Sequence, residues 1–420
     1  MENSKKKGSK NQARIIEIQE KALKKEVEDS LLEQVISFGI ESYIEVIEKE
    51  ITGICGERYR HISGREFSRW STIATPVIFG GRKVLIPHRR VRNIKINQEK
   101  ELQSISKYRD REILSRRQME QMVIGVSTRK YRRSLETDTN NVTVYSDSKS
   151  TVSRNFIAKT QEKLEAWRNE PIKENYPILM IDGIVYKKTT VIVVLGIDKY
   201  GQKRVLGAWE GSTENSRVCI DLLQSLINRG FNLTELKLAV IDGGKAIRKA
   251  LDEVFGKELL IQRCQFHKKN NVADYVPKNM RETIKRAISE AYNSEKYETA
   301  KKLLSNIIRK LEKEYPQAAR SLEEGLEETL TLHKLKAHKK IRKSLASTNP
   351  IESLNSGIKG ITRRVKRWRN SDMVIRWVCT GIIENERNFK KINGYVHLDA
   401  LLKNIDTMKK KVLDAESGAA

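Results

Sequence analysis

The feature that most constrains the fold is an ordered series of short apolar runs between residues 177 and 263. Strand-like runs occupy residues 177–186, 190–198, 204–209, 236–241 and 259–263. Helical patterns cover residues 212–228, which end just before Gly230, and a stretch from Gly243-Gly244 to about Phe255. Strands that alternate with helices predict one sheet covered by helices, because each apolar strand needs a partner layer.

The order of these elements is β-β-β-α-β-α-β, a meander followed by βα units, which is typical of a ribonuclease H-like sheet. Residues 278–345 differ, because they are nearly all helix formers with heptad-like Leu and Ile spacing. We therefore predict an α/β protein. Its ribonuclease H-like catalytic domain, residues 171–277 and 346–395, is interrupted by an all-helical insertion over residues 278–345.

Residues 15–170 predict a mainly helical N-terminal region that contains one basic β segment. Apolar residues recur at helical spacing up to about Glu50. Residues 56–92 are then rich in arginine, with strand-like runs on both sides of a predicted hairpin turn at Gly80-Gly81. We interpret this segment as a phosphate-contacting ribbon, and a solvated basic face is the alternative.

A helix-turn-helix-like pattern covers about residues 116–160. QMEQMVIGVSTRKYRRSL predicts a helix, a glycine turn and a second helix capped by Ser127. Four basic residues of the second helix are candidate DNA contacts: Arg129, Lys130, Arg132 and Arg133. A further helix, capped by Ser148 or Ser150, is expected to reach about Trp167. Such patterns are common by chance, so this signal gains weight only from its basic context.

The two ends of the chain predict little folded structure. Residues 1–14 are polar and rich in lysine, which favours a disordered basic tail. Residues 396–420 are expected to form a C-terminal tail that is loose beyond about Asn404.

The net charge favours a nucleic-acid partner. Lys and Arg total 81 against 54 Asp and Glu, which gives a formal charge of +27. A charge of this size attracts polyanions, although a solubilising surface is the alternative. No run of 18 apolar residues is present and the N-terminus has no apolar signal region, so we expect no membrane role and no secretion. The four cysteines are widely spaced, which indicates reduced thiols in a cytoplasm.

Three acidic residues stand in settings that suit metal-dependent phosphodiester cleavage. Asp182 lies in the run ILMIDGIVY, Asp242 ends the run LKLAVID, and Glu352 follows the helix-start signal Thr348-Asn349-Pro350. Two divalent metals about 3.5–4 Å apart need hard oxygen ligands, and a carboxylate cluster provides them. Because two carboxylates about 4 Å apart repel by roughly 4 kcal/mol at an effective dielectric of ~20, such a cluster is costly without cations.

The alternative for each aspartate is an ordinary Asp-Gly turn, which does no chemistry. The combination is more specific than any single residue, since Lys359 lies two helical turns after Glu352 on roughly the same face. The following run GITRRVKRWRN adds further candidate DNA contacts: Arg363, Arg364, Lys366 and Arg367. A solvated helix face is the alternative for this run.

Cys264 and His267 form a Cys-x-x-His pair that offers two zinc ligands. A structural zinc site needs four ligands, and the other candidates, Cys379, His333 and His338, show no paired spacing. We therefore expect a structural contact between Cys264 and His267 near the acidic site and no zinc.

A set of ordered motifs is similar to the Mutator-type transposases of bacterial insertion sequences. The matching stretches are STRKYRRSLE, STVSRNF, ILMIDGIVYKK, VLGAWEGSTEN, INRG, VIDGGKAIRKAL, QRCQFHKKN and STNPIESLN, in the order of the family over about residues 55–390. The resemblance implies a ribonuclease H-like domain with a helical insertion and a catalytic, metal-binding triad of Asp182, Asp242 and Glu352. It also implies Mg²⁺, which Mn²⁺ replaces, as the cofactor.

The chain departs from the resemblance at three points, and the first is that its N-terminal basic segment matches only loosely. Lys366-Arg367-Trp368-Arg369 replaces a Phe-Pro signature, and Gly183 follows the first aspartate in place of Ala. These departures concern the subgroup and the target choice more than the reaction type.

From these observations we expect a DNA transposase that cleaves the ends of its insertion sequence and joins the 3′-hydroxyl ends to target DNA. Two rivals stay open: a ribonuclease H-like nuclease without strand transfer, and a non-catalytic DNA-binding protein derived from a transposase. We expect DNA as the partner, a homodimer or higher oligomer on DNA, and a cytoplasmic, nucleoid-associated prokaryotic protein.

Overall fold

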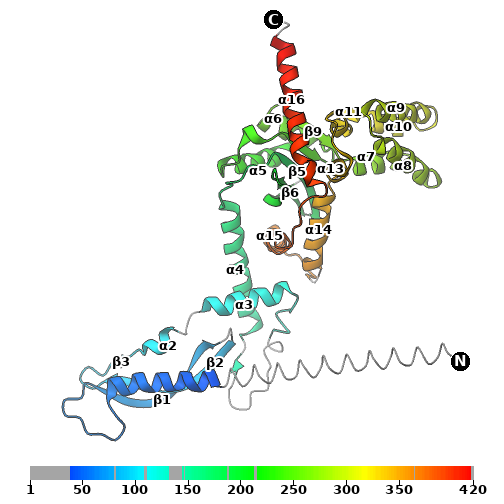
Figure 1. Ribbon diagram of the computed structural model, residues 1–420. Coiled ribbons are helices and arrows are strands. Elements are labelled where there is room, and N and C mark those ends of the chain that lie inside the picture. The colour runs from blue at the N-terminus through cyan, green and yellow to red at the C-terminus, as the bar shows by residue number, and fades with distance from the viewer. Residues whose placement is uncertain are drawn as a thin grey trace, which may run out of the picture. The chain divides into compact units, whose positions relative to one another are not determined.

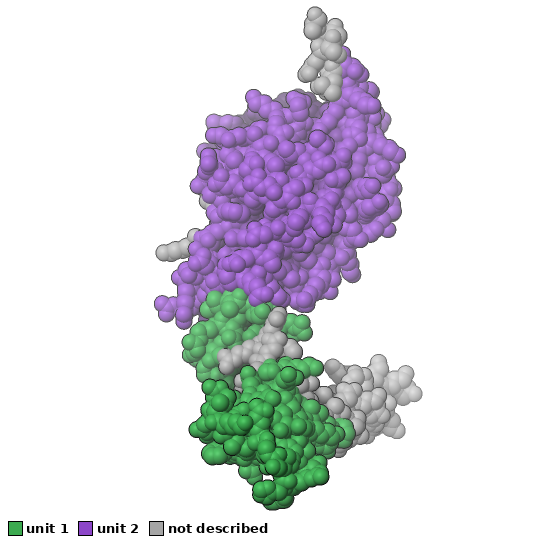
Figure 2. All heavy atoms as spheres, turned by 90° about the vertical axis from the view of Figure 1, so that its left-hand side faces the viewer, with its two compact units in different colours: residues 1–159 green, residues 160–420 purple. Residues whose placement is uncertain are grey.

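A computed structural model describes residues 38–79, 82–107, 111–131, 144–145, 147–186, 189–211, 215–363 and 365–417 (Figure 1). The chain divides into two compact units, residues 1–159 and 160–420, which Figure 2 shows in separate colours. Each unit has its own hydrophobic core.

The first unit is built on a long antiparallel hairpin. β1 (Phe67–Phe79) pairs with β2 (Arg82–Asn93), and two short strands, β3 (Glu99–Lys100) and β4 (Val144–Tyr145), also pair with β2. Alternate hairpin residues such as Val77 and Ile86 are buried with Ile47 and Ile51 of a helix over 38–55. The strands on both sides of the predicted turn are confirmed, while the turn itself, residues 80–81, lies outside the described residues.

The predicted second helix of the helix-turn-helix pattern differs from the structure at its first residues, which are the part of it that the structure describes. After α2 (Gln103–Lys107), α3 (Arg111–Val123) ends at a glycine turn, where Gly125 has a φ of +109°. Residues 128–131 then form a turn where a helix was predicted, and residues 132–143 lie outside the described chain. The tertiary reason is that Tyr131 is buried against Val152, which fixes this segment by packing rather than by helix propensity.

The predicted helix after Ser148 is confirmed as α4 (Lys149–Asn169). The Ser148 hydroxyl accepts a hydrogen bond from the backbone N–H of Thr151 at 3.2 Å, so Ser148 is the cap. α4 crosses the boundary between the two units, and its last turns bury Leu164 and Trp167 in the core of the second unit.

The second unit contains a five-stranded sheet of mixed orientation. Its strands are β5 (Ile178–Tyr186), β6 (Thr189–Ile197), β7 (Lys203–Glu210), β8 (Leu238–Ile241) and β9 (Leu260–Arg263). The spatial order is β7-β6-β5-β8-β9; the first three strands are antiparallel, and β5, β8 and β9 are parallel. All five predicted strands are confirmed to within about three residues at their ends.

Helices cover both faces of this sheet, and strand side chains alternate between the two layers. α5 (Ser216–Asn228) and α6 (Lys245–Phe255) pack on the face that carries Leu179 and Ile181, and the one-turn η2 (Leu233–Glu235) precedes β8. α14 (Asn349–Thr362), α15 (Ser371–Glu386) and part of α4 pack on the face that carries Ile178 and Met180. Both predicted crossover helices are thus confirmed.

Between β9 and α14 the chain forms a helical lobe, which Figure 1 shows on the right of the sheet. Its helices are α7 (Gln265–Asp274), α8 (Lys278–Asn293), α9 (Tyr297–Glu314), α10 (Pro316–Glu323), α11 (Leu326–Thr329), α12 (Thr331–Lys334) and α13 (Lys339–Leu345). The lobe has its own core. The buried Gln262 side chain ties it to β9, because it donates to the Thr329 carbonyl and accepts from Leu332 N–H.

The expected loose tail is wrong. After the short η3 (Tyr395–His397), residues Leu398–Ser417 form α16. Leu398, Leu401 and Ile405 recur at helical spacing. They are buried in the core on the sheet face that carries Ile178 and Met180. Within the described part of the chain, no helix is long and apolar enough to cross a membrane.

Candidate active site

The two predicted aspartates lie at equivalent positions on neighbouring parallel strands. Ile181 of β5 is opposite Ile241 of β8, so Asp182 and Asp242 occupy the next position along each strand. Both continue the series of alternate residues, Ile178 and Met180 on β5, that face α14 and α15. The strand period therefore places both carboxylates on the face that α14 covers.

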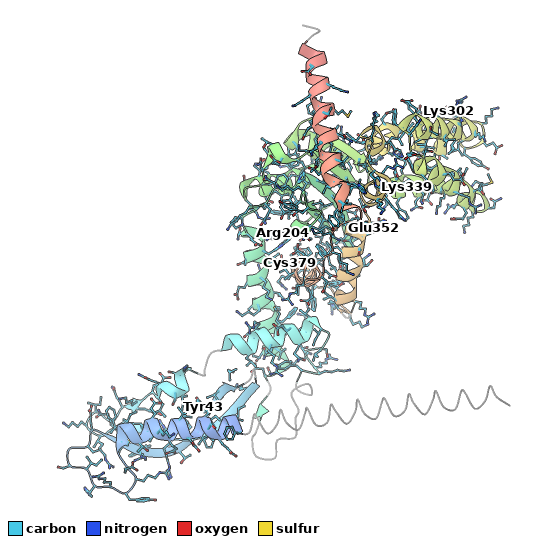
Figure 3. The ribbon with its side chains drawn as sticks, in the orientation of Figure 1. Tyr43, Arg204, Lys302, Lys339, Glu352 and Cys379 are labelled. Atoms are coloured by element: carbon cyan, nitrogen blue, oxygen red, sulfur yellow. The ribbon has the colours of Figure 1, made fainter. Side chains whose placement is uncertain are left out.

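Glu352 reaches the same face from the first turn of α14. Pro350 occupies an early position of this helix, and Ile351, Leu354 and Ile358 bury its apolar stripe against the sheet. Figure 3 marks Glu352 at the start of the helix. The structure thus brings the three predicted carboxylates toward one another from β5, β8 and α14.

The pKa of Asp182 reflects its burial and the approach of the other two carboxylates. Its side chain is buried, and its Oδ1 accepts the Gly183 N–H at 2.8 Å. Burial raises the pKa of Asp182 to about 6, the Gly183 hydrogen bond opposes the rise, and the negative fields of Asp242 and Glu352 add to it. Asp182 is therefore a carboxyl whose negative charge is disfavoured first by burial and then by its acidic neighbours, and His267 opposes this in part.

A buried hydroxyl connects Glu352 to the Cys-x-x-His pair. Thr348 Oγ lies 3.2 Å from Glu352 Oε1, 3.4 Å from His267 Nδ1 and 3.6 Å from Cys264 Sγ. Its single proton is donated to either Glu352 or Cys264, and a protonated His267 donates its Nδ1–H to the Thr348 oxygen. Cys264 is fully buried and accepts the His267 N–H at 3.5 Å, so the predicted pair is in contact and lies next to the acidic site.

His267 faces the carboxylates directly. Its Nε2 lies 3.9 Å from Glu352 Oε1. The hydrogen bond with Cys264 and the fields of Asp182 and Glu352 raise the pKa of His267 to about 9, against the effect of burial. A protonated imidazole at His267 thus offsets part of the negative charge at Asp182 and Glu352.

A glycine turn holds Asp242 in place. Asp242 Oδ1 accepts the Gly244 N–H at 2.9 Å, and Gly243 has a φ of +105°. A Cβ at Gly243 would lie 2.0 Å from Nε of Arg263, whose guanidinium donates to the Gly243 and Glu324 carbonyls. The tight turn therefore requires glycine here, and Arg263 links the turn to the helical lobe.

The donor types fit a hard divalent cation, since three carboxylates approach one another and such cations prefer carboxylate oxygens. Their present spacing is open: no three His, Cys, Asp or Glu side chains among the described residues are close enough to hold one metal ion. A bound cation would therefore require the carboxylates to move closer together.

The predicted DNA-contacting residues divide into exposed and undescribed sets. Lys359, Arg363, Lys366 and Arg367 are exposed on α14 and after it, and Arg129 and Lys130 are exposed in the turn after α3. Arg132, Arg133 and Arg364 lie outside the described residues. Trp368 of the same basic run packs edge-on against Tyr186, with ring centroids 5.4 Å apart, so it anchors the run to the core.

Sequence reasoning missed Thr348 as a site residue, and it placed the Cys264–His267 pair near the acidic site without naming Glu352 as the neighbour of His267. The available signal for Thr348 was its position, four residues before Glu352 on the same helical face. The approach of His267 to Glu352 had no local signal, because α7 and α14 are separated by the helical lobe.

Comparison with known proteins gives a consistent result. The profile of the family described as "Transposase, Mutator family" matches residues 3–392. The chain is 28% identical over 291 residues to the transposase for insertion sequence element ISRM5 of Rhizobium meliloti (strain 1021), covering 67% of this chain and 70% of the relative. It is 30% identical over 253 residues to the transposase for IS905 of Lactococcus lactis subsp. lactis (strain IL1403), covering 58% of this chain and 62% of the relative.

A third relative, the transposase for IS6120 of Mycolicibacterium smegmatis, is 32% identical over 228 residues, or 52% of this chain and 68% of the relative. These alignments span between 62% and 70% of the relatives' lengths. The family match covers nearly the whole chain and includes all three carboxylates. The chain therefore belongs to the Mutator family of transposases.

Proposed function

We propose that this chain is a DNA transposase that binds the ends of its insertion sequence, cleaves them and joins the 3′-hydroxyl ends to target DNA. The observation that carries the proposal is the approach of Asp182, Asp242 and Glu352 from two parallel strands and one helix, in a member of a transposase family. Neighbouring carboxylates on a rigid sheet suit phosphodiester chemistry because they gather cations at the scissile phosphate.

In this proposal Mg²⁺ is held by the oxygens of Asp182, Asp242 and Glu352, where it would lower the pKa of an attacking water and stabilise charge on the phosphorus. The chain's own residues orient these ligands. Thr348 directs its hydroxyl to Glu352, and the Gly243-Gly244 turn fixes Asp242. His267 offsets part of the negative charge of the carboxylates before a metal binds.

We also assign the second unit to the ribonuclease H-like class. The meander β5-β6-β7 followed by the parallel strands β8 and β9 supports this assignment, as does a helical lobe inserted before the helix that carries Glu352.

DNA is the proposed partner. A net charge of +27 and the exposed basic residues Lys359, Arg363, Lys366 and Arg367 favour contact with phosphates. Joining requires two element ends in one complex, so we propose a homodimer or higher oligomer on DNA, acting in a prokaryotic cytoplasm at the nucleoid.

The test is a cleavage and strand-transfer assay with an end of the insertion sequence, a target plasmid and Mg²⁺. We expect nicked ends and joined products from the natural chain, and neither from Asp182→Ala, Asp242→Ala or Glu352→Ala. Nicking without joined products would point to a nuclease. Full cleavage by any one of the three variants would refute the assignment of that residue.

A further inference from the structure

A cavity of about 330 Å³ lies next to the acidic site and is not used by the proposed cleavage chemistry. It is lined by residues of α7, α8 and α13 and by the segment that leads into α14. We call it the basic cavity and define it by Phe266, Lys269, Lys339, Arg342, Lys343 and Ser347.

The basic cavity is coupled to the acidic site through two chain neighbours. Phe266 precedes His267, and their rings form an edge-on contact with centroids 5.8 Å apart. His267 in turn lies 3.9 Å from Glu352. On the other wall, Ser347 directly precedes Thr348, whose hydroxyl contacts Glu352. A strand whose phosphate lies at the carboxylates would therefore meet this cavity within a short distance.

The lining of the cavity is strongly cationic. Four of its residues are lysine or arginine, and no acidic residue is among the lining residues that the structure describes. Arg342 already donates to the Ser294 and Glu295 carbonyls, and Lys269 donates to the Ser289 hydroxyl. Lys339 and Lys343 are exposed, so they offer charge to an incoming anion such as a phosphate.

Two further groups suit a nucleotide. The Ser347 side chain is buried, yet its hydroxyl has no hydrogen-bond partner among the described residues, which leaves a polar group available to a ligand. Phe266 is an exposed aromatic ring, 41% accessible, with the Lys269 ammonium 5.6 Å from its centroid. A ring beside a cation is a platform on which a base stacks while its phosphate is neutralised.

A second cavity extends the cationic surface. It has a volume of about 440 Å³, shares Lys343 with the basic cavity, and adds Lys203, Lys390 and Lys391. Positive charge thus continues past the start of α14, as a ligand with several phosphates needs and a single small anion does not.

We propose that the basic cavity holds one unpaired nucleotide of the DNA strand next to the cleavage position, with its base on Phe266 and its phosphates at Lys339 and Lys343. This inference rests on the proposed function, because it takes DNA as the substrate of the neighbouring carboxylates. The volume lies in the range of small-ligand sites, so one nucleotide fits and a duplex does not.

The experiment measures binding by the full chain, in EDTA so that no cleavage occurs, to a duplex that carries one unpaired 2-aminopurine. We expect tighter binding than to the fully paired duplex, together with loss of 2-aminopurine emission as the base stacks. Phe266→Leu should restore emission and weaken binding to the unpaired probe about tenfold. Lys339→Gln and Lys343→Gln should each lower the magnitude of the salt slope by about 0.7.

Matched controls keep the test specific. Lys302→Gln removes the same charge from α9, which Figure 3 shows away from Lys339 and Glu352, and Tyr200→Leu removes an exposed ring from the β6–β7 turn. Both should bind like the natural chain. Equal affinity for paired and unpaired probes, unchanged emission, or equal weakening by Lys302→Gln would overturn the proposal.

Two results distinguish this inference from a free-nucleotide site and from the proposed cleavage function. If deoxyadenosine monophosphate binds more tightly than the unpaired duplex, the cavity is a free-nucleotide site and the proposal is wrong. If the natural chain stacks the unpaired base in EDTA but never cuts DNA with Mg²⁺, the cleavage function fails while the nucleotide site stands.

Discussion

The acidic site and the basic cavity are neighbours, yet the chain builds them in different ways. The carboxylates of Asp182 and Asp242 come from paired strands whose register leaves little freedom, and Glu352 comes from the first turn of a packed helix. The cations of the basic cavity come from helices of the lobe, and Lys339 and Lys343 keep long exposed side chains.

This difference follows from the free energy needed to hold each kind of charge in place. Like charges near one another repel, and Asp182 also loses hydration because it is buried, so the paired strands and the packed helix must hold these side chains in place. Exposed lysines keep their hydration until a phosphate displaces it, so they need no rigid support. We infer that the sheet positions the reacting groups and that the lobe holds the strand.

The largest expected effect concerns the acidic site alone. Asp242→Asn and Glu352→Gln keep the shape of each side chain but remove its charge. Each should lower the rate of DNA cleavage by at least about a thousandfold, because several kcal/mol of charge stabilisation at the phosphate are lost. Filter binding should give affinities within about twofold of the natural chain. Glu312→Gln, the same change on exposed α9, serves as the control, and equal loss there would break the comparison.

The second effect is a pH dependence of stability. Because the folded pKa of Asp182 is raised to about 6, above its ordinary value of 3.8, the folded chain holds a proton that the unfolded chain releases between these values. Stability is therefore lost as pH rises from about 4 to 6, by roughly 3 kcal/mol. Asp182→Asn should not lose stability in this way. Its melting temperature should therefore be higher than that of the natural chain at pH 7 and the same at pH 3.5.

Calorimetry of the second unit's transition, in EDTA, measures this difference. Asp399→Asn changes an exposed aspartate of α16 and should leave the pH profile as it is. Parallel profiles for Asp182→Asn and the natural chain would show that folding does not raise the pKa of Asp182. Adding Mg²⁺ should stabilise the natural chain more than the variant, because a cation relieves the same repulsion.

A smaller effect is expected at the hydroxyl that joins the two regions. Thr348→Val removes the donor to Glu352 while keeping the side-chain shape, and we expect about a tenfold slower cleavage step with unchanged DNA affinity. Thr348→Ser should recover most of the rate. Thr362→Val, a buried threonine of the same helix that contacts Tyr186, tests for a general packing effect. A lower affinity without a slower cleavage step would contradict the positioning role.

The smallest expected effect is a change in the salt dependence of DNA binding. It distinguishes the exposed basic end of α14 from the basic cavity. On a fully paired duplex, Lys359→Gln should reduce the magnitude of the salt slope by about 0.9, since one phosphate contact is lost. Lys339→Gln should leave that slope unchanged, because its proposed ligand is an unpaired nucleotide. Titrations between 50 and 200 mM salt, with Lys302→Gln as control, decide this, and identical slopes for all three variants would remove the distinction.

Much of the second unit could be predicted from local sequence. The five strands and two crossover helices follow from the period of their apolar residues, and the same period places Asp182 on the side of Met180. The errors have local causes too. The stripe Leu398, Leu401 and Ile405 lies before a run of lysines, and that charge concealed an amphipathic helix.

The helix prediction for the segment after α3 failed for a different reason. Its composition suits a helix, but residues 128–131 form a turn after Gly125, where Tyr131 is buried against Val152 of α4. Propensity is worth only tenths of a kcal/mol per residue, so one buried aromatic contact overrides it.

By itself the sequence determined the kinds of element, the charge of the chain and the identity of three carboxylates, because periodicity and residue chemistry are local properties. Only the tertiary structure decided that Thr348 and His267 contact Glu352, and that Lys339 and Phe266 share a cavity beside it. The physical reason is that α7, α13 and α14 meet through packing of the helical lobe on β9, and contacts between distant segments leave no periodic signal in the chain.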